Sequence, residues 1–295
     1  MSVREALVQL GGVATRPGLV AATSRAQVDA ALDEGEILAL ARGRYALPEA
    51  DEARQAAHQV SGTVSHVSAA LQWGWSVKQV PLLPDVTLPR SRNVTPAHRT
   101  GITLHRADLT LDDVVDGVTS RERTLLDCLR LPDRGAAQAI ADSALRDGFS
   151  DKLLVRLAAD ARGPGVLQAR RVAANATDLA ANPFESALRD IASDVPGLAV
   201  RPQVPVFGRA EFLGRPDLVD DELMIVLEAD SFEWHGGRAA LQRDARRYNR
   251  FVAHGWLVVR FAWEDVMFDA PYVRETLAAL VHGRTQCVCW RVRPA

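Results

Sequence analysis

The sequence is poor in lysine, although it is not poor in positive charge. Lys78 and Lys152 are the only lysines among 295 residues, so nearly all cations are arginines, and the formal net charge is −2. A chain with this balance has no overall attraction for nucleic acid. Any binding to DNA or RNA must therefore come from local basic patches.

The sequence also has few cysteines and no long apolar run. Cys128, Cys287 and Cys289 are odd in number and unevenly spaced, which excludes a disulfide framework or a recognisable zinc motif. No apolar stretch reaches the ~18 residues of a membrane span, and the first residues lack the hydrophobic region of a signal peptide. We therefore expect a reduced, cytoplasmic protein with neither a membrane partner nor a small-molecule cofactor.

What is present is the composition of an ordinary globular protein, 47% hydrophobic and 24% charged, in a chain long enough for two domains. The patterning predicts the α/β (α+β) class. Residues 1–48 alternate short helices and strands, and 49–160 are mostly helical with one extended stretch. Residues 161–181 contain a linker, and 182–295 have the strand-rich pattern of an α/β unit.

The first region reads as three short helices followed by a β-ribbon, which is the order of a winged helix-turn-helix. The helix that begins after Ser24 would present Arg25 and Gln27 to the major groove. Arg42 and Arg44 on the ribbon could hold phosphates. The alternative is that these are solvated groups on a small helical module that binds protein.

A resemblance extends this interpretation over about residues 1–150. The segments "GGVATRPGLVAATSRAQVDAALDEGEILALARGRYAL", "TVSHVSAALQWGW" and "TSRERTLLDCLR" are similar to those of AbiEi-type antitoxins, which pair a winged helix with a helical domain. The resemblance implies sequence-specific DNA binding, autoregulation of a type IV toxin–antitoxin operon and a cognate toxin protein as partner. A domain that targets another activity to DNA is equally compatible with it.

A helix with both ends marked opens the last region. Asn182 can cap it, Pro183 suits its first position, and Gly197 follows its last turn. Glu185 then falls at the third helical position, where a carboxylate commonly bonds back to the cap. A capping role is therefore one complete explanation for Glu185.

Acidic residues then gather where apolar strands end. We expect strands near 198–206, 211–219 and 223–229, the last two paired as a hairpin. This pairing would bring Asp217 beside Glu228, with Asp230 on the same face as Glu228. Neighbouring carboxylates need a shifted pKa or a bound cation, and Mg²⁺ or Mn²⁺ prefers such ligands. Alternatively, these acids pair with arginines of the following helix.

That following helix, in "GGRAALQRDARRYNRFVAHG", is rich in arginine. Arg243, Arg246 and Arg247 could neutralise a phosphate backbone next to the acids. The alternative partners are Asp244 and solvent, as on any charged helix face.

The order helix, three strands, helix, strand resembles the Vsr-like branch of the PD-(D/E)XK endonuclease superfamily over about residues 182–268. The matching segments are "NPFESALRD", "GRPDLV", "VLEADSFEWHGG", "RDARRYN" and "GWLVVRFAWEDV". The resemblance implies that Asp217, Glu228 and Glu185 bind Mg²⁺ or Mn²⁺. It also implies that His235 lies near the attacking water, where a neutral imidazole can act as a general base.

One position departs from the superfamily pattern. Asp230 stands where a lysine is usual, and no lysine follows Lys152, although Vsr-like enzymes lack that lysine as well. Asp230 would then be a further acid of the site. The sequence predicts a DNA-binding, Mg²⁺-dependent endodeoxyribonuclease. The alternatives are an antitoxin-like repressor with a non-catalytic nuclease-like domain, and an enzyme that cleaves RNA.

Overall fold

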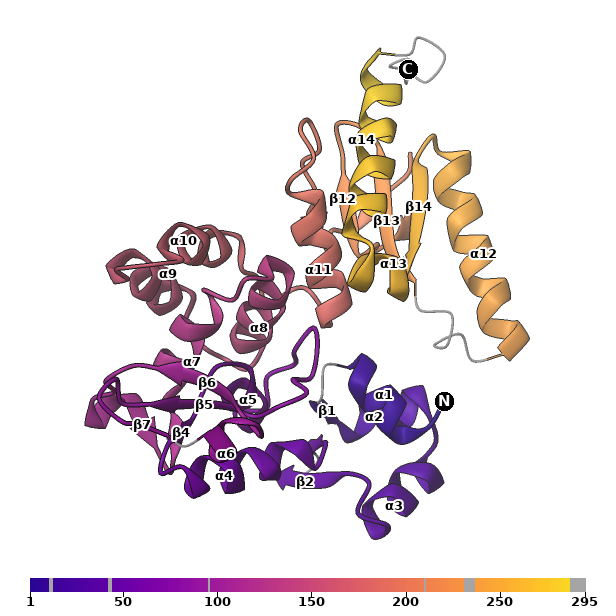
Figure 1. Ribbon diagram of the computed structural model, residues 1–295. Coiled ribbons are helices and arrows are strands. Elements are labelled where there is room, and N and C mark those ends of the chain that lie inside the picture. The colour runs from indigo at the N-terminus through magenta and orange to yellow at the C-terminus, as the bar shows by residue number, and fades with distance from the viewer. Residues whose placement is uncertain (11–12, 42–43, 95, 210, 231–236, 287–295) are drawn as a thin grey trace. The chain divides into compact units, whose positions relative to one another are not determined.

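The protein is a mixed α/β chain, in agreement with the class expected from its patterning. The computed structural model describes residues 1–10, 13–41, 44–94, 96–209, 211–230 and 237–286. It divides into two compact units, Met1–Asp178 and Leu179–Ala295, here called the N-terminal and C-terminal units (Figure 1). Among the described helices, none is both long and apolar enough to cross a bilayer.

The first elements of the N-terminal unit build a small three-helix cluster with its own core. Ser24 caps the third helix by accepting a hydrogen bond from the backbone of Gln27 at 3.3 Å. Leu7, Leu19 and Val28 are fully buried beneath a three-stranded sheet in the order β1-β3-β2. The elements are α1 (Val3–Gln9), β1 (Val13–Thr15), α2 (Arg16–Ala22), α3 (Arg25–Asp33), β2 (Leu38–Ala41) and β3 (Arg44–Ala46).

The rest of this unit contains more strand than its sequence predicts. Instead of one extended stretch, five short strands form a mixed sheet in the order β6-β5-β4-β8-β7. Strands of two to four residues are too short to show the alternation that identifies a strand in sequence. They are β4 (Thr63–Val64), β5 (Asp85–Leu88), β6 (Thr103–Arg106), β7 (Val114–Val115) and β8 (Val118–Thr119).

The helices of this region include one inside the segment predicted as a linker. Helix α10 (Val166–Asn175) buries Ala169, Val172 and Ala173 in the same core as α8 and α9. The interpretation of 161–181 as a linker therefore missed a packed helix, and the boundary between the units follows it at Asp178. The other helices are α4 (Glu49–Gln59), α5 (His66–Gln72), α6 (Pro96–Arg99), α7 (Arg121–Cys128), α8 (Arg134–Arg146) and α9 (Asp151–Asp160).

The C-terminal unit is a four-stranded sheet covered by helices on both faces (Figure 1). The strand order is β14-β13-β12-β9, in which β13 and β14 are parallel and the other pairs antiparallel. Its elements are α11 (Pro183–Ala192), β9 (Arg201–Pro202), β10 (Val206–Phe207), β11 (Phe212–Gly214), β12 (Leu218–Asp220), β13 (Ile225–Asp230), α12 (Gly237–Ala253), β14 (Leu257–Ala262), α13 (Trp263–Phe268) and α14 (Ala270–Gln286).

The two faces of strand β13 lie in two different cores. Ile225 and Leu227 pack with α11, α13 and α14, whereas Val226 packs with Phe251 of α12. Since side chains alternate along a strand, Glu228 lies on the α12 face together with Val226. The sheet therefore presents the acidic end of β13 to the side that carries the arginine-rich helix.

Candidate functional site

The antiparallel pairing of β12 and β13 places two carboxylates side by side. Leu218 pairs with Leu227 in this register, so the preceding Asp217 lies opposite Glu228. Asp217 Oδ2 accepts a hydrogen bond from the backbone N–H of Ala229 at 2.8 Å. Glu228 is only 4% exposed. We call Asp217 and Glu228 the acid pair.

Burial dominates the electrostatics of the acid pair. It raises the pKa of Asp217 above the ordinary value of 3.8, and the hydrogen bond from Ala229 and the charge of Arg247 oppose this effect. A carboxyl group in these surroundings is held closer to its protonated form than one in water. Such a pair carries a cost that a bound cation would remove.

Glu185 is linked to the acid pair through a residue that sequence reasoning missed. Gln203 Nε2 lies 3.1 Å from Glu185 Oε2 and 3.1 Å from Asp217 Oδ1, so its carboxamide bridges the two acids. Its backbone N–H also donates to the carbonyl of Asp217 at 3.0 Å. Gln203, which follows β9, therefore links Glu185 of α11 to Asp217, which precedes β12 and lies opposite Glu228 of β13.

Gln203 holds this position with a strained backbone. Its φ of 54° lies in the left-handed region, which costs a non-glycine residue about 1–3 kcal/mol. This kink also separates β9 from β10, where the sequence predicts one continuous strand over 198–206. The only signal in the sequence is a single glutamine within an apolar, strand-like stretch, and such residues are common on exposed strands.

The capping role expected for Glu185 is present as well. Asn182 accepts a hydrogen bond from the backbone of Glu185 at 3.0 Å and donates to its Oε1 at 3.0 Å. Glu185 Oε2 also accepts from the backbone N–H of Ala181 at 2.9 Å. The carboxylate therefore closes the start of α11 and meets Gln203 at the same time.

Arg247 packs against the acid pair, whereas a residue that only contacts DNA phosphates would be fully exposed. Its Nη2 is 3.4 Å from Glu228 Oε1, and its side chain is 29% exposed. The guanidinium lies over the ring of Tyr248, 5.0 Å from its centroid, and Arg260 stacks on the same ring at 4.6 Å. The alternative that an arginine of this helix pairs with the acids thus holds for Arg247, while Arg243 and Arg246 are exposed.

Two further predicted residues cannot be placed with their side chains. Asp230 is the last residue of β13, but its side chain is not among those that the structure describes, and His235 lies outside the described residues. Within the described ranges, no group of three or more His, Cys, Asp or Glu side chains is arranged to hold a metal ion. The acid pair is therefore at most part of a metal site.

The residues predicted to contact DNA in the N-terminal unit are described only in part. Arg25 and Gln27 are exposed at the start of α3, where Gln27 Oε1 accepts from the hydroxyl of Ser24 at 2.9 Å. Arg44 belongs to β3, but its side chain is not described, and Arg42 lies outside the described residues. Part of the capacity of Gln27 to read a base is thus used in capping its own helix.

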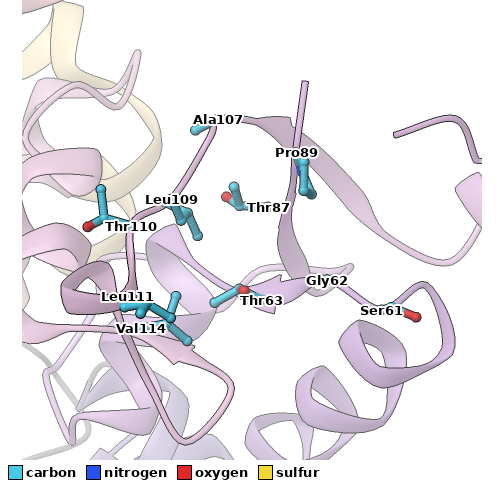
Figure 2. Close-up of a pocket in the computed structure, with 10 residues that line it drawn as sticks. All are labelled: Ser61, Gly62, Thr63, Thr87, Pro89, Ala107, Leu109, Thr110, Leu111 and Val114. Atoms are coloured by element: carbon cyan, nitrogen blue, oxygen red, sulfur yellow. The ribbon is translucent and has the colours of Figure 1, made fainter. Parts of the chain in front are cut away.

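A cavity of about 360 Å³ in the N-terminal unit is a second location that could hold a ligand. Figure 2 shows Leu111 and Val114 on one side and Pro89 on the other. The lining residues that the structure describes are Ser61, Gly62, Thr63, Thr87, Pro89, Ala107, Leu109, Thr110, Leu111 and Val114. None of these side chains is charged, so the cavity offers hydroxyl groups and apolar surface but no general acid or base.

Comparison with known proteins places the chain among uncharacterized relatives. No family model matches it. Over 254 residues it is 25% identical to two uncharacterized proteins of Mycobacterium tuberculosis, MT2308 of strain CDC 1551 / Oshkosh and Rv2248 of strain ATCC 25618 / H37Rv. Each match covers 82% of this chain and 92% of the relative, so the likeness includes both units.

Proposed function

We propose that the protein is a metal-dependent endonuclease that acts on DNA through its C-terminal unit. The observation that carries this proposal is the acid pair, in which Asp217 lies opposite Glu228 across the hairpin and is bridged to Glu185 by Gln203. Two neighbouring carboxylates repel each other unless they share a proton or a cation, and a site for a hard cation uses such ligands. The exposed Arg243 and Arg246 on the adjacent helix suit a phosphate backbone.

The side chains of the acid pair fit Mg²⁺ or Mn²⁺ by their chemistry, because both supply carboxylate oxygens. Asp217 and Glu228 would hold the ion, with Glu185 connected through Gln203. A bound ion of this kind polarises a scissile phosphate and makes a water molecule a better nucleophile. Gln203 would fix the direction of the Asp217 carboxylate, and His235 would take the proton of the attacking water. Asp230, in place of a lysine, would be a further acid of the site.

The N-terminal unit would bring this activity to DNA. Its order of three helices and three strands supports a winged helix-turn-helix in which α3 enters the major groove and Arg25 reaches the bases. A helical domain like that of AbiEi-type antitoxins would follow it, and a PD-(D/E)XK-like domain would form the C-terminal unit. Such a protein would work in the cytoplasm.

The test is cleavage of supercoiled plasmid DNA with Mg²⁺ or Mn²⁺ by the wild type and by Asp217→Ala. We expect cleavage only by the wild type. Asp221→Ala is the matched control, since Asp221 lies next to the same hairpin but is 46% exposed and pairs with Arg201. Equal activity of Asp217→Ala, or no cleavage of any DNA, would refute the assignment. Cleavage restricted to RNA would keep the chemistry but change the substrate.

A second function is favoured by the position of Arg247. Its guanidinium, 3.4 Å from Glu228, offsets part of the negative charge without any metal. This arrangement suits a non-catalytic domain in an antitoxin-like repressor that binds its own promoter and a cognate toxin. In that case, a gel shift with the upstream DNA would be unaffected by EDTA and by Asp217→Ala, while Arg25→Ala would weaken it.

A further inference from the structure

The hairpin of β10 and β11 has one buried face and one aromatic, exposed face. Val206 and Leu213 are buried in the core that also contains Phe251 of α12. On the opposite face, Phe207 and Phe212 are directly paired across the strands and are 65% and 51% exposed. Their ring centroids lie 5.5 Å apart, with the planes tilted by 56°. We call this pair of rings the aromatic pair.

Two neighbouring exposed rings form a small apolar patch, which differs from isolated apolar side chains on a surface. A single exposed apolar side chain is common, but a contiguous patch beside charged groups marks an interaction surface. Next to the aromatic pair, the Gly208 N–H donates a hydrogen bond to the carbonyl of Glu211 at 2.8 Å. The two rings therefore project from paired strands, β10 and β11.

Exposed positive charge lies near the aromatic pair in the chain. Arg209 lies between the two phenylalanines in the chain, Arg215 follows them, and both arginines are exposed. Strand β11 packs on helix α12, because a Cβ added at Gly214 would lie 3.2 Å from the ring of Phe251. Asp217 is five positions after Phe212 in the chain, so the two Cα atoms lie at most about 18 Å apart.

We propose that the aromatic pair is a stacking platform for unpaired bases of the DNA strand that reaches the acid pair. This proposal rests on the proposed function and names the form of its substrate, a single strand or a locally unpaired duplex. Exposed rings flanked by arginines bind such strands because bases stack on the rings and phosphates meet the guanidinium groups. Bases in an intact duplex stack on each other and are less available.

The test is a binding measurement with the full-length protein in EDTA, which makes it independent of cleavage. The probes are a fluorescent single-stranded oligonucleotide, a strand of the same length in which consecutive bases are replaced by abasic sites, and a paired duplex. We expect the wild type to prefer the strand with bases, and Phe207→Ala/Phe212→Ala to lose roughly tenfold or more of that affinity. Binding of the abasic strand should stay the same.

Phe268→Ala is the matched control, since Phe268 is 61% exposed in α13 of the same unit. The slope of affinity against salt concentration should not change in the double variant, because no phosphate contact is removed. Unchanged binding of the strand with bases would overturn the platform even if the wild type cleaves DNA. Equal loss on the abasic strand, or conversion of a dimer to a monomer without any change in DNA binding, would overturn it as well.

Discussion

The two units treat their buried carboxylates differently. In the N-terminal unit, Asp85 Oδ1 lies 2.8 Å from His105 Nε2, and Asp127 Oδ2 lies 2.9 Å from Arg123 Nε. Each of these acids has a basic side chain as its neighbour. In the C-terminal unit, Asp217 instead lies opposite a second acid, Glu228, and Arg247 lies 3.4 Å from Glu228. A buried acid is therefore not by itself a sign of a functional site in this protein. A buried acid whose neighbour is a second acid is the better indicator.

Acids with a basic partner have their charge balanced within the fold, whereas two neighbouring acids cost free energy that another interaction must offset. A buried pair of opposite charges keeps its members satisfied, although its net contribution to stability is small. Two like charges gain nothing from each other unless they share a proton or a cation. Asp220 of the C-terminal unit supports this distinction, since its oxygens accept from the backbone N–H groups of Ala199 at 2.7 Å and Leu223 at 2.9 Å.

The largest expected effect of removing one acid of the pair is on cleavage. If the pair holds the metal, Glu228→Gln should lower kcat/KM for DNA by about a thousandfold, equivalent to ~4 kcal/mol of transition-state stabilisation. Asp127→Asn should leave kcat/KM unchanged, because Asp127 belongs to the other class of buried acid. Initial rates on a labelled duplex and single strand would measure both. Equal losses in the two variants would mean that the comparison does not identify the site.

A change in the N-terminal unit should have its main effect on stability. Arg123→Met keeps an unbranched apolar stem but removes the guanidinium, which leaves Asp127, 7% exposed, without its nearest cation. The free energy of unfolding should fall by about 3 kcal/mol, since a lone buried charge is costly. Glu228→Gln should cost less, because its partner Arg247 is 29% exposed and keeps access to solvent. Urea denaturation of both variants measures these changes. A larger loss of unfolding free energy in Glu228→Gln than in Arg123→Met would contradict this division of roles.

A smaller effect is expected from the amide that connects the acids. Gln203→Ala removes the bridge between Glu185 and Asp217, and residues that orient metal ligands typically change affinity by about 10–100-fold. We expect Mn²⁺ binding, followed by calorimetry, to weaken within this range. Asn175→Ala in α10 of the other unit serves as a control for removal of a carboxamide. If Gln203→Ala binds Mn²⁺ as tightly as the wild type, Gln203 does not orient the metal ligands and has only a structural role.

Much of the acid pair could be predicted from the sequence because its determinants are local. Two apolar runs joined by a short acidic turn predict a hairpin, and the alternation of side chains then fixes which residues face each other. Asn182 and Pro183 likewise predict the start of α11, which carries Glu185. These features depend on neighbours a few residues away, which a single sequence displays.

The features that were missed depend on longer range or on backbone strain. Strand β4 pairs with β8, more than fifty residues later, and β5 pairs with β6 across a helix, so no local pattern announces this sheet. Gln203 contacts both of its partners from a backbone with a φ of 54°, which its sequence does not indicate. The aromatic pair was missed because Phe207 follows one predicted strand and Phe212 lies in the next, and exposed and buried phenylalanines look alike in sequence.

The smallest expected effect concerns the dependence of stability on pH. Burial raises the pKa of Asp217 in the folded protein above 3.8, so the folded state holds a proton that the unfolded state has already lost. Stability should therefore fall as the pH rises from 3.8 through the raised pKa, and should change no further above it. In Asp217→Asn this contribution is absent, so the variant should gain stability relative to the wild type across that window.

The shape of this difference, rather than its absolute value, is the measurement. The amide introduced by Asp217→Asn would lack one acceptor for the N–H groups of Gln203 and Ala229, which adds an offset that does not depend on pH. Urea denaturation at a series of pH values, with Asp221→Asn as the exposed control, separates the offset from the titration. Mg²⁺ competes with the proton for a carboxylate, so its addition should flatten the wild-type curve if the acid pair binds it. A stability of Asp217→Asn that falls relative to the wild type as the pH rises would contradict the idea that two like charges are held together at a cost.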